Sequence, residues 1–119
     1  MTRLLPTCAA ALLCAPLAAA AAACDDARAV AAVRAAAERD RIDLSTLQLV
    51  VEGPYGRAKF VRTHPTFPTT PTARRRLAKR TFWFVWFHPP FQTVGARGSD
   101  LWALVDASRC ELLHVASPR

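Results

Sequence analysis

The stretch Thr81 to His88, TFWFVWFH, decides the fold of this chain. Six consecutive residues of it are aromatic or valine, and such residues are typical of β-strands because they pack well on a pleated surface. Successive side chains of a strand point to opposite faces of its sheet. One face would carry Phe82, Phe84, Trp86 and His88, and the other Trp83, Val85 and Phe87.

Because both faces are apolar, we predict a central strand with a helix on one face and loops on the other. Pro89 and Pro90 would end it, since proline cannot donate to the ladder. The alternative is that the second face is a partner or ligand surface, because large exposed apolar patches mark interaction sites.

The segments on either side of this strand also have strand patterns. After it, Asp100 to Ala107 and Cys110 to Ala116 predict two strands joined by a tight turn that begins at Asp106. Before it, Asp43 to Thr63 predicts a β-hairpin with a turn at residues 53–56, GPYG. Phe60 would be the main core residue of the return strand, RAKFVRT.

The segment Cys24 to Arg41 predicts a helix, because it is rich in alanine, the best helix former. Asp25 would be its N-cap. The predicted fold is therefore α+β, with one N-terminal helix packed on a four- to five-stranded antiparallel sheet. The predicted strands are those around Leu49, Phe60, Phe84, Leu104 and Leu113.

Residues 1–23 have the pattern of an export signal. Arg3 supplies a positive n-region, an apolar stretch follows, and residues 21–23 offer an A-x-A cleavage site. Because the apolar stretch is mostly weakly apolar alanine, cleavage is favoured over a transmembrane anchor. We predict a signal peptide, 1–23, and a single domain, 24–119, that is periplasmic or secreted.

Cleavage would leave two of the four cysteines, Cys24 and Cys110. Two cysteines in an exported chain predict one disulfide. The alternative is a lipoprotein with Cys24 as the lipidated first residue, but a lipobox normally has Leu where this chain has Ala21.

The net charge is +7, and the cations are concentrated in the sequence ARRRLAKR. The candidate residues for binding an anionic partner are Arg74, Arg75, Arg76, Lys79 and Arg80. Such a patch could bind anionic lipid, polysaccharide or an acidic protein, and an exported protein is not expected to meet nucleic acid. Alternatively, the segment is a solvated loop or short helix that maintains solubility.

We find no motif for catalysis, a metal or a cofactor. None of the three histidines, His64, His88 and His114, has metal-ligand spacing with another His or Cys. Ser108, His114 and Asp106 make a Ser/His/Asp set on paper only, because no nucleophile elbow is present. We therefore expect a protein without catalytic residues, metal or cofactor.

The ending LWALVDASRCELLHV resembles the close of a PepSY-type domain, in which a strand ends in a Val-Asp-Ala turn. The segment ARAVAAVRAAA followed by LQLVV is similar to the helix and strand that open such domains. Two features depart from the family: Cys110 stands where a Gly is common, and the Pro/Thr and Arg-rich insertion is unusual.

The resemblance implies a helix laid across an antiparallel sheet, as in cystatin-like folds. It also implies a small exported binding or inhibitory module with a protein partner in the cell envelope and no catalytic residue. The alternative function is a cell-envelope protein that binds an anionic lipid or glycan surface through the Arg-rich segment. The sequence leaves the oligomeric state open.

Overall fold

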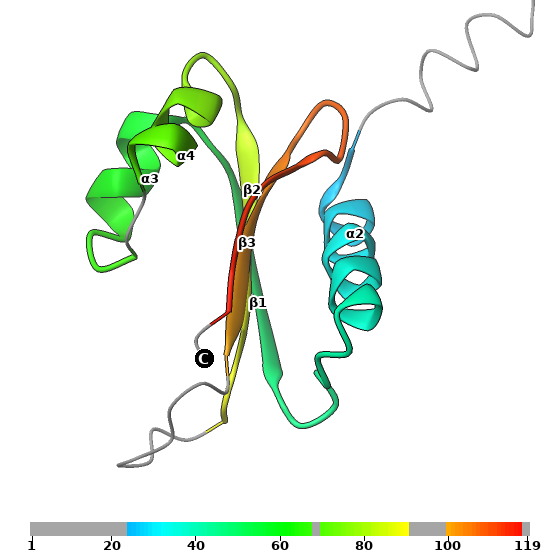
Figure 1. The fold of residues 1–119 in the computed structure, drawn as a ribbon. Coiled ribbons are helices and arrows are strands. Elements are labelled where there is room, and N and C mark those ends of the chain that lie inside the picture. Colours follow the sequence, from blue (N-terminus) through cyan, green and yellow to red (C-terminus); the bar gives the residue numbers. More distant parts are fainter. Residues whose placement is uncertain (1–23, 68–69, 91–99, 118–119) are drawn as a thin grey trace, which may run out of the picture.

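The computed structural model describes residues 24–67, 70–90 and 100–117. The signal peptide predicted for residues 1–23 lies outside the described residues. The described part contains three helices and four strands (Figure 1). In chain order they are α2 (Asp26–Arg39), β1 (Gln48–Tyr55), α3 (Arg57–Thr63), α4 (Pro71–Leu77), β2 (Phe82–His88), β3 (Leu101–Asp106) and β4 (Leu112–Ala116).

The four strands form one antiparallel sheet in the order β1-β2-β3-β4. β2, the aromatic stretch, lies inside the sheet, as predicted. Val85 is opposite Val51 on β1 and Ala103 on β3. All six residues of β3 are buried. The α+β class and the antiparallel sheet are confirmed.

α2 covers one face of the sheet (Figure 1). The buried residues of the helix are Ala29, Val33, Ala36 and Ala37. They are small, so the helix can lie close to a sheet face that carries Val85 and Phe87. Asp25 is the N-cap, and its carboxylate accepts a hydrogen bond from the Arg28 N–H at 2.9 Å, as predicted.

The disulfide between Cys24 and Cys110 is present, with 5.3 Å between the Cα atoms. It joins the residue before the α2 N-cap to the turn that precedes β4. The Trp83 indole N–H donates to the Cys24 carbonyl at 3.0 Å, so the start of α2 is also held to β2.

α3 and α4 cover the other face of the sheet (Figure 1). Phe60 of α3 and Leu77 of α4 are fully buried, and they pack with Phe82 and Phe84 of β2. The expectation that loops cover this face is therefore wrong, and so is its interpretation as an uncovered partner surface.

The return strand predicted at residues 57–63 is also wrong, because this segment is helix α3. Its Arg, Ala and Lys residues are good helix formers. One fully buried side chain, Phe60, suits a short helix as well as a strand. Among the described residues the sheet therefore has four strands, and the strand expected around Phe60 is not one of them.

α4 begins inside the Pro/Thr-rich segment, where Thr70 is the N-cap and Pro71 the first helical residue. Its helical part includes three residues of the basic segment, Arg74, Arg75 and Arg76. Before α3, β1 has an irregular register between Glu52 and Tyr55, and a cis peptide bond joins Gly53 to Pro54. Gly53 has φ 128°, and a Cβ there would lie 2.9 Å from the Phe82 carbonyl oxygen.

Candidate functional site

A mainly apolar groove lies between α2 and β1. It is lined by Asp26, Ala27 and Val30 of α2 and by Leu49 and Val51 of β1, and its volume is about 310 Å³. The groove exists because α2 packs mainly over β2 and β3, so the edge strand β1 is only partly covered. Leu49 is 40% exposed.

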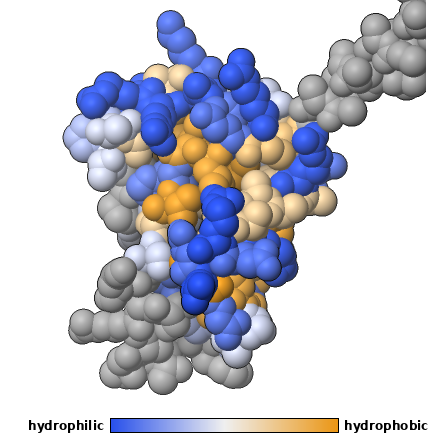
Figure 2. Space-filling model, turned by 45° about the vertical axis from the view of Figure 1, so that its right-hand side comes forward, coloured by the Kyte–Doolittle hydropathy of each residue, from blue (hydrophilic) through white to orange (hydrophobic). Residues whose placement is uncertain are grey.

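Figure 2 brings the α2 side of the molecule forward. Hydrophobic side chains gather near the middle of this face, with hydrophilic side chains around them. Apolar surface rimmed by polar residues is typical of places where proteins bind each other.

One charged residue of α2 lies in the groove and another lies near its end. Asp26 lines it directly. The Arg34 guanidinium lies over the Phe87 ring, 5.1 Å from its centroid, and Phe87 is opposite Leu49 in the register. The groove therefore has an acidic group in its lining, and a basic group of α2 lies near its Leu49 end.

A second hollow of about 260 Å³ lies between α4 and β4. Its lining is more polar, and it consists of Thr70, Thr72, Ala73, Arg76, Leu113, His114 and Val115. Burial, together with the nearby Arg76 charge, lowers the pKa of His114 below its usual value. The imidazole is therefore neutral at pH 7.

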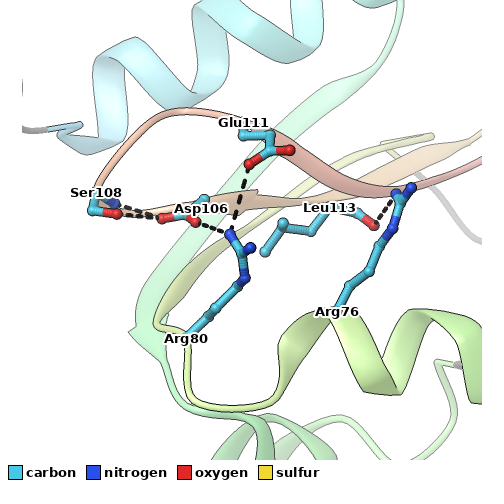
Figure 3. A network of polar contacts seen from close by, with 6 residues as sticks. All are labelled: Arg76, Arg80, Asp106, Ser108, Glu111 and Leu113. Carbon is cyan, nitrogen blue, oxygen red and sulfur yellow. Dashed lines mark hydrogen bonds and ion pairs between the residues drawn. The ribbon is translucent and has the colours of Figure 1, made fainter.

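The structure divides the five predicted cations into two groups. Arg76 and Arg80 are directed at the sheet (Figure 3). All five are exposed, but within residues 24–67, 70–90 and 100–117 no carboxylate forms an ion pair with Arg74, Arg75 or Lys79. The sequence pattern could not separate these two groups.

Arg80 belongs to a polar network around Asp106, which is 4% exposed (Figure 3). Arg80 donates to one carboxylate oxygen of Asp106 and lies 3.6 Å from Glu111. The backbone N–H and the hydroxyl of Ser108 both donate to the other oxygen at 2.8 Å. Burial alone would raise the pKa of Asp106, but hydrogen bonds from Ser108, Arg80 and the Arg109 N–H lower it overall.

A second network ties β1 to α3. The Tyr55 hydroxyl donates to the Glu52 carboxylate at 2.7 Å, and a ring nitrogen of His64 lies 2.7 Å from the same oxygen. The hydrogen bonds from Tyr55 and His64 lower the pKa of Glu52. Burial and the Glu52 carboxylate raise the pKa of Tyr55 to about 12.

The Ser/His/Asp set considered from sequence does not form a triad. Ser108 and Asp106 are hydrogen-bonded within one turn, whereas the His114 ring lies against Trp102, 4.8 Å between centroids. The described residues contain no group of three or more His, Cys, Asp or Glu side chains that could hold a metal ion. No helix among the described residues is long and apolar enough to cross a membrane.

Comparisons with known proteins gave no match to a family model, a curated protein or a solved structure. The PepSY-like resemblance thus stays an expectation from the sequence. The sequence analysis did not predict the groove between α2 and β1. Its signal in the sequence was the apolar run Leu49, Val50 and Val51, which a two-sided strand explained equally well.

Proposed function

We propose that this chain is a small exported binding module without catalytic activity, and that it holds a protein partner in the cell envelope along the groove between α2 and β1. The observation that carries the proposal is an apolar groove of about 310 Å³ beside an edge strand. Grooves of this kind receive peptide segments in several families of binding domains.

Export is part of the proposal. Disulfides form and persist in oxidising compartments, and the Cys24–Cys110 bridge is compatible with such a location. The pattern of residues 1–23 and the PepSY-like resemblance, which implies exported binding or inhibitory modules, support the same proposal from the sequence.

Site-specific photo-crosslinking tests this function. A photo-reactive benzoyl-phenylalanine replaces Leu49 in the groove or, as the control, Val61 of α3, which is exposed to a similar degree, 44% against 40%. Each purified variant is irradiated with a cell-envelope extract at moderate salt, and the adducts are identified by mass spectrometry.

We expect a discrete protein adduct from position 49 that is missing from position 61, and binding of that partner, once purified, to the unmodified chain. Absence of an adduct at position 49, or the same adducts at both positions, would reject the groove as the binding site.

A second candidate function is binding to an anionic lipid or glycan surface. The observation in its favour is the exposed group of Arg74, Arg75 and Lys79 on α4 and the residues after it. Attraction between exposed charges is screened by salt, so binding to anionic vesicles should occur at low salt and disappear as salt rises. The triple Ser variant of these residues should lose it. The matched control removes three cations elsewhere: Arg39, Arg41 and Arg109.

A further inference from the structure

One contact shows which residues of β2 hydrogen-bond to β1 and which to β3. The Ala107 N–H donates to the Thr81 carbonyl at 2.9 Å, and these residues continue the β2–β3 register by one position. In an antiparallel pair, hydrogen-bonded and non-hydrogen-bonded residue pairs alternate. The odd-numbered residues of β2 therefore bond to β3, and its even-numbered residues bond to β1.

The same alternation fixes which groups of β1 face outward. Gln48, Val50 and Glu52 are opposite even-numbered residues of β2, so their N–H and C=O groups are used inside the sheet. The N–H and C=O groups of Leu49 and Val51 point to the open edge of the sheet. No hydrogen bond within the described part of the chain reaches these four groups. Leu49 and Val51 are also the β1 residues that line the groove.

On the opposite edge of the sheet, a side chain occupies one backbone group. The Leu113 carbonyl of β4 lies at the register irregularity of the β3–β4 pair, and the Arg76 guanidinium donates to it at 3.3 Å (Figure 3). Blocking an edge with a charged side chain is a common protection against unwanted strand pairing. A side chain of α4 thus occupies the Leu113 carbonyl of β4, whereas no side chain occupies the outward groups of Leu49 and Val51 among the described residues.

We infer that the occupant of the groove is an extended segment of the partner protein that pairs antiparallel with β1. This inference rests on the proposed function and specifies how the partner is held. The outward N–H and C=O groups of Leu49 and Val51 would bond to the segment's backbone. Side chains at alternate positions would enter the groove, since every second residue of a strand faces the same side.

The charges of α2 indicate the sequence preference. α2 starts beside Trp83 and passes Phe87 at Arg34, so Asp26 lies toward the Val51 end of the groove and Arg34 toward the Leu49 end. A segment antiparallel to β1 would enter at the Asp26 end and leave at the Arg34 end. The segment should therefore carry two aliphatic residues at i and i+2, with a basic residue before them and an acidic residue after them.

The probe is a fluorescent synthetic peptide of sequence KTVTVTE, in which the Lys, both Val and the Glu share one face. Its control, ETVTVTK, has the same composition with the charges exchanged. Fluorescence polarisation with the full mature chain should show KTVTVTE binding about tenfold more tightly, because the control replaces two attractive charge pairs by two like-charge contacts. Equal binding of both peptides would overturn the charge assignment.

The matched protein variants are Leu49→Pro and Val115→Pro. Both positions are exposed on edge strands with their N–H groups outward, so neither proline removes a bond inside the sheet. Leu49→Pro should weaken peptide binding at least about tenfold through loss of a donor and obstruction of the edge, and Val115→Pro should leave binding unchanged. Leu49→Ala, which keeps the N–H, should weaken it only a few-fold.

Amide hydrogen exchange by NMR tests the same pairing without any variant. In the free chain the Val50 N–H should be protected, and the N–H groups of Leu49 and Val51 should exchange fast. Saturating KTVTVTE should slow exchange at Leu49 and Val51 at least about tenfold, and unchanged exchange would overturn strand pairing.

The proposed function and this inference can fail separately. If position 49 crosslinks to a partner whose binding Leu49→Pro does not change, the groove is a binding site but strand pairing is wrong. If the chain instead forms a dimer that Leu49→Pro dissociates, the edge belongs to a second copy and the inference is overturned.

Discussion

Replacement of Asp106 by alanine should destabilise this protein strongly. The side chain is buried. It accepts a charge-assisted hydrogen bond from Arg80 and two hydrogen bonds from Ser108 that close the turn. The variant would leave the Arg80 guanidinium without its main partner and would loosen the turn that leads to Cys110.

The magnitude follows from the contacts. Hydrogen bonds to charged groups contribute about 1.5–3 kcal/mol each, and breaking a buried pair costs about 3–5 kcal/mol. The Arg80 side chain is 40% exposed, so solvent screens part of this interaction. We expect Asp106→Ala to lower the free energy of unfolding by about 3 kcal/mol, and Tm by about 10–20 °C for a domain of this size.

The assay is urea unfolding at pH 7, followed by circular dichroism, with Glu111→Ala as the control. Glu111 is paired with the same guanidinium at 3.6 Å but is 55% exposed, so its loss should cost at most about 1 kcal/mol. If Asp106→Ala were no more destabilising than Glu111→Ala, the network would have no structural importance and the reasoning would be refuted.

The network also predicts a pH dependence. The pKa of Asp106 is lower in the folded chain than its ordinary value of 3.8, because the hydrogen bonds it accepts outweigh the effect of burial. The folded state therefore gains stability from the carboxylate at pH values above 3.8 and loses it as the pH falls through the folded pKa. Asp106→Asn should lose this part of the acid sensitivity, and an unchanged acid profile would contradict the assignment.

Two further predictions concern the disulfide and Tyr55. Intact-mass analysis with and without reductant should show one disulfide within residues 24–119. Reduction should lower the free energy of unfolding by up to about 4–5 kcal/mol, because the bridge closes a loop with a sequence separation of 86, and two free thiols before reduction would contradict the structure. Tyr55 is the only tyrosine of the chain, so ultraviolet absorbance of tyrosinate reports its pKa directly, which should be about 12 in the folded state. Because the ordinary value is 10.0, stability should fall as the pH rises from 10 toward 12. Glu52→Gln should lower the pKa only in part, because burial is the larger cause, and a pKa near 10 in the native chain would contradict both the burial of Tyr55 and its contact with Glu52.

The aromatic stretch and its neighbours were predictable because their signals are local. Six consecutive aromatic or valine residues at Phe82–Phe87 fit a pleated surface that is buried on both faces, so they favour a central strand. Alanine content and the Asp25 cap specify α2 in the same way. The pairing of Cys24 with Cys110 required only the count of cysteines outside the predicted signal peptide.

The helix α3 could not be predicted from local sequence patterns. The segment RAKFVRT is short enough for its pattern to suit either a strand or a helix, and the choice depends on what Phe60 packs against. The second face of β2 needs apolar cover, and a helix brings Phe60 onto Phe82 and Phe84. Contacts between residues distant in the sequence thus decided the local structure.

The sequence by itself determined the α+β class, the central strand with its two apolar faces, the first helix and the disulfide. Only the tertiary structure decided which cations of the basic segment bond to the sheet, because Arg76 and Arg80 reach Leu113 and Asp106, which are distant in the sequence. The tertiary structure also decided that β1 lies at an open edge of the sheet. Whether a strand lies inside a sheet or at its edge depends on the order of the strands, and that order is set by packing between distant segments.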